Sequence, residues 1–535
     1  MVEALTKPVG RRAQRLWERG MAAAALAAAL LLFAPGAHAA PDGNALYQAH
    51  CASCHGEQRL GGQGPALLPG NMRLDKQGIR AVIAQGRHAT QMPAYQDKLS
   101  AKQIGALASF VASKPETRPS WTAADISASR RTLTPESALP DRPVHDANPK
   151  HLFVVVEKGD HHVSILDGDG FRRIARFPSR YALHGGPKFS PNGRFVYFAS
   201  RDGWITKYDL WALEKVAEVR AGLNTRNIAI SGDGETLAAA NYLPRRLVML
   251  DAGDLSLEKV IPARGMHGEM SRVSAVYQAR PRGSFIAAMK DIPEVWEIPY
   301  GEDPPAQTGF VHSHRKGMKE AIPTRTQRFP VRRIEVKQPL DDFFFGPDYR
   351  VLIGADRQGG RAKVVHLEVG REIASLPLEG LPHLGSGISW TRNGERVMAT
   401  PHLRGGKVSV ISMDDYEVVK EIATGGPGFF MRSHPKVDTA WVDVFFGPNH
   451  DKLHVIDKQT LKIIDTLQPA PGKTAAHVEF SHDGRYALVS VWEKDGAIVV
   501  YDTATRAVVK RIPMSKPSGK YNVANKIRFT AGTSH

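Results

Sequence analysis

Phe189-Ser190-Pro191-Asn192-Gly193-Arg194-Phe195 is one copy of a short element that recurs through most of this chain. Each copy consists of an aromatic or apolar residue, a polar turn and the start of a strand-like run. The clearest other copies are Ile230-Ser231-Gly232-Asp233-Gly234-Glu235, Phe345-Gly346-Pro347-Asp348-Tyr349-Arg350, Trp390-Thr391-Arg392-Asn393-Gly394-Glu395 and Phe480-Ser481-His482-Asp483-Gly484-Arg485. Asn-Gly and Asp-Gly between strand-like runs predict hairpin turns, because these residues adopt positive φ at low cost.

The spacing of the copies predicts the architecture. Degenerate copies begin near Asn148, Gln278 and Ser433, and successive starts lie about 40 to 50 residues apart, the period of a four-stranded propeller blade. A β-sandwich array would not keep one period for so long. We therefore predict an all-β, eight-bladed propeller over residues 146–535, with residues 301–333 as a basic, turn-rich insertion on one face.

The chain before the propeller has a different texture. Residues 44–50 and 76–85 have helical patterns, and a third helix is expected after Ser100, a suitable N-cap residue. Residues 40–114 are therefore predicted to form a small all-α domain. Residues 115–145 are rich in Pro, Ser, Thr and Ala and are predicted to be a linker with a short helix at 123–130.

The helical domain contains Cys51-Ala52-Ser53-Cys54-His55, the pattern that attaches a haem covalently. The two thiols add across the vinyl groups of the haem, and His55 is placed to bind the iron. A disulfide redox motif or half of a zinc site would use the same spacing. The chain has only these two cysteines, and they lie in a helical segment of cytochrome size. These facts favour a covalent haem c held by Cys51, Cys54 and His55.

The opposite axial ligand of this haem has two candidates. Met92-Pro93-Ala94-Tyr95 is typical of the methionine loop of small c-type cytochromes, and His88 lies four residues earlier. A methionine thioether raises the potential and leaves no open coordination position. We favour Met92, and with either ligand the haem is expected to transfer electrons rather than to catalyse a reaction.

The N-terminus predicts export. Four arginines precede the apolar run 21–33, and Ala37-His38-Ala39 matches a cleavage site, so residues 1–39 read as a signal peptide and the protein as periplasmic. A membrane anchor is the alternative, but the run is shorter than the roughly 20 residues that span a bilayer. The net charge of +17 suits an anionic partner. The chain has no nucleic-acid-binding motif, so no nucleic-acid partner and no stable membrane insertion are expected.

A cytochrome c domain followed by an eight-bladed propeller resembles the cytochrome cd1 nitrite reductase family over almost the whole mature chain. The matching segments include Tyr181-Ala182-Leu183-His184, Arg201-Asp202-Gly203, Thr225-Arg226-Asn227, Ser433-His434-Pro435-Lys436 and Pro517-Ser518-Gly519-Lys520-Tyr521-Asn522-Val523. The resemblance implies that His184 is the proximal iron ligand of a non-covalent haem d1. It also implies that Arg201, Arg226 and Lys158, which stands where the family has an arginine, bind the carboxylates of this haem.

The departures from the family pattern point to changed chemistry. The reductases hold two histidines above the d1 iron; one of these positions resembles Asp341 here, and the other is retained as His383. His477, in Ala475-Ala476-His477-Val478-Glu479-Phe480, is a histidine that the reductases do not normally have. This pattern resembles the branch of the family that dehydrogenates dihydro-haem d1 in the last step of haem d1 synthesis.

The resemblance therefore implies an oxidoreductase that converts a propionate side chain of dihydro-haem d1 into an acrylate, with electrons passing to haem c. His477 is the candidate base, and His383 is a distal iron ligand or a second acid–base group. The expected partners are the tetrapyrrole substrate, a soluble periplasmic electron acceptor, other haem d1 biosynthesis proteins and the nitrite reductase. Two other functions stay open: a working nitrite reductase, and a non-enzymatic carrier or electron-transfer protein for haem d1.

Overall fold

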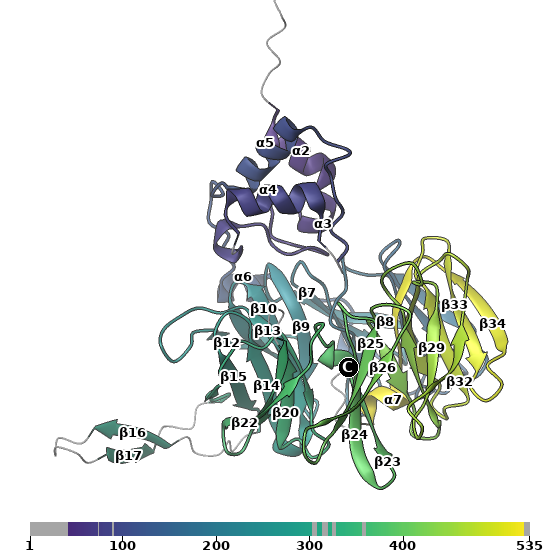
Figure 1. The fold of residues 1–535 in the computed structure, drawn as a ribbon. Helices are drawn as coiled ribbons and strands as arrows, with labels where there is room; N and C mark the ends of the chain where they lie inside the picture. The colour runs from purple at the N-terminus through teal and green to yellow at the C-terminus, as the bar shows by residue number, and fades with distance from the viewer. Residues whose placement is uncertain are drawn as a thin grey trace, which may run out of the picture.

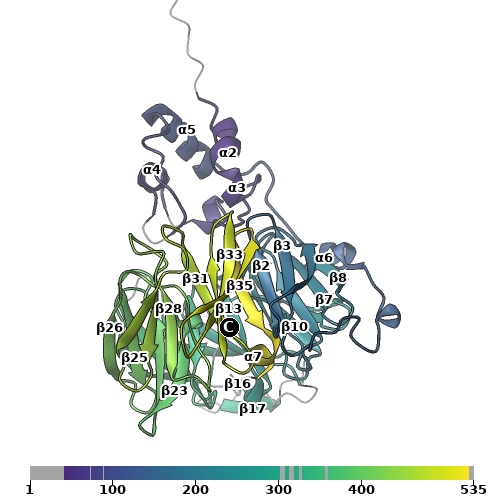
Figure 2. The ribbon, with the colours of Figure 1, turned by 90° about the vertical axis from the view of Figure 1, so that its right-hand side faces the viewer.

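The computed structural model describes residues 41–72, 74–87, 90–301, 308–312, 319–323, 328–355 and 360–528. A small helical domain lies above one face of a ring of β-sheets (Figure 1, Figure 2). The predicted signal peptide and His88 lie outside the described residues. Within the described part of the chain, none of the helices combines the length and the apolar character that crossing a bilayer requires.

The helical domain forms where the sequence patterns predict it. Its helices are α2 (Gly43–His50), α3 (Ala52–His55), η1 (Pro69–Asn71), α4 (Lys76–Gln85) and α5 (Ala101–Ala112). Ser100 caps α5 in a capping box with Gln103, which satisfies two of the backbone N–H groups that a helix start leaves unpaired. Tyr47 and Leu107 are fully buried in the core that these helices share.

The segment predicted to be a linker is partly folded onto the propeller. It contains α6 (Ala123–Ser129), β1 (Arg131–Thr132) and η2 (Glu136–Ala138). Strand β1 pairs antiparallel with Glu218 and Ala217 of β8, and Ile126 of α6 is fully buried against the same blade. The two-residue strand β1 is too short to produce an alternating pattern that a sequence could reveal.

Eight antiparallel sheets form the ring, as the repeat predicts; seven have four strands, and the sheet of blade 2 has β1 as a fifth. The first blade combines the last strand of the chain with the first propeller strands, which closes the ring. The blades are numbered in chain order: blade 1, β35 (Pro517–Asn522), β2 (Phe153–Glu157), β3 (His162–Leu166) and β4 (Arg173–Pro178); blade 2, β5 (Lys188–Phe189), β6 (Phe195–Ala199), β7 (Trp204–Asp209) and β8 (Glu214–Arg220); blade 3, β9 (Asn224–Ile230), β10 (Thr236–Leu243), β11 (Arg246–Asp251) and β12 (Leu257–Pro262); blade 4, β13 (Val273–Ala279), β14 (Ser284–Met289), β15 (Glu294–Pro299) and β18 (Arg332–Glu335), with η3 (Arg280–Arg282).

The second half of the ring repeats the same plan. Its blades are: blade 5, β19 (Asp342–Phe345), β20 (Val351–Ala355), β21 (Arg361–His366) and β22 (Arg371–Pro377); blade 6, η4 (Leu384–Ser386), β23 (Ile388–Arg392), β24 (Glu395–Pro401), β25 (Lys407–Ser412) and β26 (Val418–Ala423); blade 7, β27 (Met431–Ser433), β28 (Thr439–Asp443), β29 (Leu453–Asp457) and β30 (Ile463–Leu467); blade 8, β31 (Ala475–Phe480), β32 (Tyr486–Val491), β33 (Gly496–Asp502) and β34 (Val508–Met514). Helix α7 (Val523–Ile527) follows β35.

The long gap in the repeat is an insertion in blade 4. It contains a two-stranded hairpin, β16 (Thr308–His312) and β17 (Lys319–Pro323), that projects from the ring (Figure 1). Large apolar side chains pack between neighbouring blades. Trp441 of blade 7, for example, meets Phe480 of blade 8 edge-on, with ring centroids 6.0 Å apart. Because the inner strands of all blades run in the same direction, the residues at their N-terminal ends meet at one end of the central channel.

Candidate functional site

The haem-attachment motif has the local geometry that a covalent haem needs. Cys51 and Cys54 are not joined to each other, so both thiols are available. His55 is buried, and its Nδ1 lies 2.8 Å from the carbonyl oxygen of Pro65. A hydrogen bond at Nδ1 fixes the tautomer and leaves the Nε2 lone pair free to bind iron. Burial lowers the pKa of His55, which keeps the imidazole neutral for coordination.

The backbone next to His55 passes so close to the imidazole that only a glycine fits there. A Cβ atom at Gly64 would lie 2.6 Å from His55 Cε1, so any larger residue would displace the imidazole. The loop of Met92 packs against the end of α4, where its carbonyl oxygen accepts a hydrogen bond of 3.1 Å from Arg87 N. The choice between Met92 and His88 as the second ligand stays a prediction.

The haem-attachment motif faces the propeller. The hydroxyl of Tyr181 donates to the carbonyl oxygen of Ser53, which lies between the two cysteines. Asn224 Nδ2 donates to Leu60 O at 2.9 Å, which connects the same domain to the start of β9. Tyr181 is only three residues from His184, so the two predicted haem sites lie on neighbouring parts of the fold.

His184 lies in a tightly turned segment before β5. Its amide donates to Ala199 O at 2.9 Å, and Ala182, Gly185 and Gly186 all have positive φ. Gly185 is required here, because a Cβ atom would lie 2.5 Å from Asn227 Cβ. These constraints fix the backbone that carries the imidazole.

The ring of His184 is oriented by Arg226. Its Nδ1 lies 2.8 Å from Arg226 O, so Nδ1–H donates there and Nε2 keeps its lone pair. The guanidinium Nη1 of Arg226 lies 2.9 Å from Nε2, so Arg226 must turn aside when an iron binds. Burial, followed by the charges of Arg201, Arg226 and Lys158, lowers the pKa of His184 well below its usual value. The imidazole is therefore neutral and suited to coordinate iron.

The same data place the predicted anion-binding residues around His184. The pKa of His184 is lowered, after burial, by the charges of Arg201, Arg226 and Lys158, so these four residues lie close together. Burial, followed by the charges of Arg201 and Lys516, lowers the pKa of Lys158 to about 8. Such a concentration of positive charge is costly in a desolvated place unless an anion binds there. It fits the carboxylates of a tetrapyrrole.

His383 precedes η4, at the channel end of blade 6. Its Nδ1 lies 2.6 Å from Phe429 O, and its Nε2 lies 4.0 Å from Asp342 Oδ2. Burial, the largest influence, lowers its pKa, whereas the Asp342 carboxylate acts in the opposite direction. The charge of Arg226, which contacts His184, also acts on His383, so His383 lies near the predicted anion-binding residues.

His477 occupies a strained position in β31. It has a φ of 50°, and the register between β31 and β32 shifts between Ala476 and Val478, so His477 is the extra residue of a β-bulge. Its side chain is buried between Phe430 and Tyr521, with ring centroids 4.7 and 5.3 Å away. Bulges re-aim a side chain, and non-glycine residues with positive φ concentrate at functional sites.

One carboxylate that the sequence analysis missed accepts hydrogen bonds from the backbone that positions both His383 and His477. Asp443, at the end of β28, is fully buried and accepts hydrogen bonds from Phe429 N (2.7 Å), Phe430 N (2.9 Å) and His477 N (2.9 Å). Because Phe429 O accepts from His383, Asp443 is linked to His383 through one residue and to His477 directly. Burial raises the pKa of Asp443 to about 6, against the opposing effect of these amides.

Other residues at the site were missed or had a different neighbour. Asp341, which stands where the reductases have a histidine, pairs with Lys290, whereas the adjacent Asp342 accepts from Tyr277 Oη (2.8 Å) and Gly385 N (2.7 Å) beside His383. Lys520 is fully buried and donates to the carbonyl oxygen of His477.

The sequence contains a signal for Asp443, because an acidic residue in the otherwise apolar run 440–444 is unusual unless its carboxylate is hydrogen-bonded.

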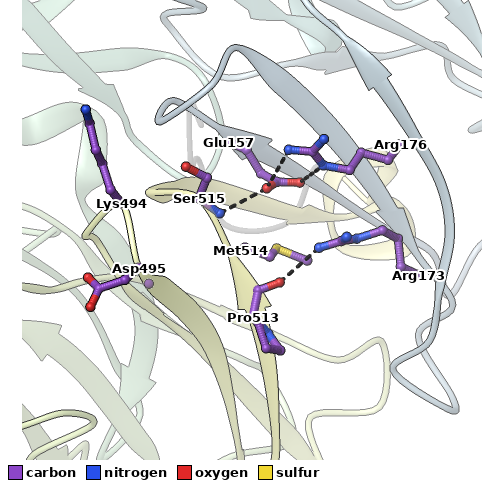
Figure 3. Close-up of a pocket in the computed structure, with 9 residues that line it drawn as sticks. Glu157, Arg173, Arg176, Lys494, Asp495, Pro513, Met514 and Ser515 are labelled. Atoms are coloured by element: carbon purple, nitrogen blue, oxygen red, sulfur yellow. Dashed lines mark hydrogen bonds and ion pairs between the residues drawn. The ribbon is translucent and has the colours of Figure 1, made fainter.

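A groove between blades 1 and 8 lies apart from this site. It has a volume of about 460 Å³ and is lined by Glu157, Arg173, Arg176, Lys494, Asp495, Gly496, Pro513, Met514 and Ser515 (Figure 3). Arg176 and the amide of Ser515 both bind the Glu157 carboxylate, at 3.1 Å each. None of the predicted site residues lines this groove.

Comparison with known proteins gives the family. Residues 147–526 match the family described as cytochrome D1 heme domain, and residues 38–111 match the family described as cytochrome C oxidase, cbb3-type, subunit III. This chain belongs to the cytochrome D1 heme domain family. Its small domain is a cytochrome c domain with a covalent haem c, and its propeller binds a d1-type tetrapyrrole.

Individual members of the family differ in their similarity to this chain. Dihydro-heme d1 dehydrogenase of Pseudomonas aeruginosa is 53% identical over 511 residues, which cover 95% of this chain and 99% of that protein. Nitrite reductase of Stutzerimonas stutzeri is 26% identical over 537 residues, which cover 90% of this chain and 92% of that protein. A solved structure of dihydro-heme d1 dehydrogenase NirN in complex with DHE is 54% identical, with a TM-score of 0.75, and covers 91% of this chain and 99% of that chain.

Replacing His184 by alanine tests the proximal ligand. We expect His184→Ala to lose the change in visible absorption that the d1-type tetrapyrrole undergoes on binding, because no imidazole remains to bind its iron. The matched control is His267→Ala, since His267 is exposed. Titration of both variants with the tetrapyrrole gives the answer, and an unaltered spectrum and affinity in His184→Ala would remove the assignment.

Replacing Asp443 by asparagine tests the shared support of His383 and His477. The amide of asparagine can accept at only one of its two positions, so at least one of the three buried N–H groups loses its partner. We expect Asp443→Asn to lower the free energy of unfolding by about 1–3 kcal/mol. Asp438→Asn, an exposed position of the same blade, should change it by less than about 0.5 kcal/mol. Chemical denaturation measures both, and equal stability of the two variants would contradict the account.

Proposed function

We propose that this protein is a dehydrogenase that oxidises dihydro-haem d1 to haem d1. The observation that carries the proposal is the identity of 53% across almost the full length of a dihydro-heme d1 dehydrogenase. The site offers the groups that this reaction needs: a neutral imidazole for iron, cations for carboxylates, and two further histidines on one support. The predicted signal peptide supports a location in the periplasm.

Oxidation of a propionate side chain to an acrylate removes two hydrogens, which leave as two protons and two electrons. We assign one proton to His477, whose bulged backbone, bound by Asp443, aims the imidazole from a fixed position. His383 either binds the iron on the face opposite His184 or accepts the second proton, and its lowered pKa keeps it neutral for both tasks. Lys158, Arg201 and Arg226 would hold the carboxylates and so orient the macrocycle.

The covalent haem held by Cys51, Cys54 and His55 would supply a one-electron acceptor close to this site. A soluble periplasmic electron acceptor would then restore its oxidised state after each electron. The contact between Tyr181 and Ser53 supports this arrangement, because it joins the haem-attachment motif to the segment that carries His184. We propose, as further partners, haem d1 biosynthesis proteins that supply the substrate and a nitrite reductase that receives the product.

A nitrite reductase and a haem d1 carrier are the competing functions. At the position where the reductases have their second histidine, Asp341 forms an ion pair with Lys290. A carrier would need the anion-binding residues and His184, but it would have no use for a base held in a strained bulge. Both observations favour the dehydrogenase.

The mass of the bound tetrapyrrole distinguishes the three functions. The protein with its covalent haem is incubated with dihydro-haem d1 and an oxidant for the covalent haem. The non-covalent tetrapyrrole is then extracted, and its mass is measured by mass spectrometry. We expect the pigment to lose two hydrogens. A parallel incubation contains nitrite and a reductant for the covalent haem. An unchanged mass with consumption of nitrite in the parallel sample would identify a reductase, and an unchanged mass without it would identify a carrier.

Replacing His477 by alanine tests the assignment of the base. We expect His477→Ala to lower kcat by about 10²–10⁴-fold, the usual contribution of general base catalysis, while tetrapyrrole binding persists through His184. His402→Ala is the matched control, because His402 is a buried propeller histidine that binds Glu379 O and Ser409 Oγ instead. Unimpaired conversion by His477→Ala would remove the catalytic assignment.

The pH dependence of kcat in the wild-type protein tests the roles of His383 and Asp443. His383 has a lowered pKa and Asp443 has a pKa of about 6, so above pH 7 the imidazole is neutral and the carboxylate ionised. Acidification below about pH 6 protonates Asp443 and weakens its bonds to the backbone of His477. We therefore expect kcat to be level near neutral pH and to fall as pH drops through about 6. A rate that rises on acidification would contradict this scheme.

A further inference from the structure

We propose that His151, Asp169 and His482 form a binding site for a divalent transition-metal ion that ties the first blade of the ring to the last. The three side chains come from different turns: His151 precedes β2, Asp169 lies between β3 and β4, and His482 lies between β31 and β32. One potential ligand atom from each residue lies within 4.8 Å of the others.

The cluster is separate from the tetrapyrrole site. His151 and Lys158 lie at opposite ends of β2, which spans Phe153–Glu157. Since a strand rises about 3.3 Å per residue, β2 alone separates its two ends by about 13 Å. The proposed metal site therefore lies on the face of the ring that points away from the cytochrome c domain, and the proposed dehydrogenase reaction does not use it.

The distances suit metal coordination. His151 Nδ1 lies 2.9 and 3.0 Å from the two carboxylate oxygens of Asp169. Zinc binds nitrogen and oxygen ligands at about 2.0–2.2 Å, which places two neighbouring ligand atoms roughly 3 Å apart. The imidazoles of His151 and His482 are stacked with centroids 3.4 Å apart, and their rings would turn out of this stack to direct one nitrogen of each at the same ion.

The chemistry of the stacked pair favours the same conclusion. A neutral imidazole offers a nitrogen lone pair, which is the donor that divalent transition metals bind. His482 Nδ1 is buried and has no hydrogen-bond partner among the described residues. A buried polar atom without a partner is costly, and a bound ion would satisfy it. Two imidazoles and a carboxylate are the donor set of divalent transition metals such as zinc.

The sequence places this histidine at one copy of the repeated turn only. The positions that correspond to His482 in the other four clear copies are Pro191, Gly232, Pro347 and Arg392. His482 is thus the copy that belongs to the last blade, directly beside His151 of the first. The neighbouring backbone is packed tightly, because a Cβ atom at Gly168 would collide with His151 O. His151 O also accepts from Asn522 Nδ2 at 2.9 Å, which connects the cluster to the closing strand β35.

Zinc titration of the haem-loaded protein without a histidine tag tests the proposal. After treatment with a chelator, calorimetric titration with Zn²⁺ should show a saturable site that accounts for one ion per chain. His482→Gln and Asp169→Asn should each weaken this site by at least about tenfold, the lower limit for losing even an outer partner of a metal site. His267→Gln, an exposed histidine elsewhere, should bind zinc as the wild type does.

A second measurement tests the connection between the blades. Zinc should raise the thermal midpoint of the wild-type protein, because an ion that binds only the folded ring stabilises it, and should leave the midpoint of Asp169→Asn unchanged. Asp169 is exposed, so this variant is expected to fold. A wild type without a saturable site, or a site that survives in both variants, would overturn the proposal and leave the cluster as a stacked pair with a surface ion pair.

Discussion

The buried carboxylate of Asp443 is the constraint on which the geometry of the candidate active site depends. It takes three backbone N–H groups that would otherwise be unpaired, two from the turn before β27 and one from the bulge in β31. The turn positions the carbonyl oxygen that orients His383, and the bulge carries His477. A regular strand would not place His477 in this position, so the chemistry that we propose rests on Asp443, a residue that does not need to touch the substrate.

Positive charge determines the role of the residues around His184. His184 is surrounded by Lys158, Arg201 and Arg226, and burial lowers the pKa of Lys158, so a bound anion would stabilise its positive charge. The same cations keep His184 neutral, which is the state that iron requires. A tetrapyrrole with several carboxylates satisfies both conditions at once, because its iron meets the imidazole while its acidic groups meet the cations. His184 and the cations would thus hold the substrate, whereas His477 and His383 would take part in proton transfer.

Much of the fold could be predicted from the sequence, because its signals are local. The repeated turn gives the eight blades, and the capping residue Ser100 gives the start of α5. The candidate histidines came from motif resemblance rather than from physical patterns. Asp443 stands out in the sequence as an acidic residue in an apolar run, but its partners could not be predicted, and neither could the φ of His477, since both depend on contacts between different blades. The folding of residues 131–132 onto β8 was missed for a similar reason: two residues carry no periodicity, and their partner lies far away in the chain.

The most direct test of the account is a crystal structure of this protein with dihydro-haem d1 bound. The account predicts that His184 Nε2 binds the iron on one face of the macrocycle and that Arg226 has turned away from the ring. His383 should lie on the other face, and the His477 imidazole should lie beside the propionate that becomes the acrylate. An iron without a bond to His184, or a His477 ring remote from every propionate, would contradict it.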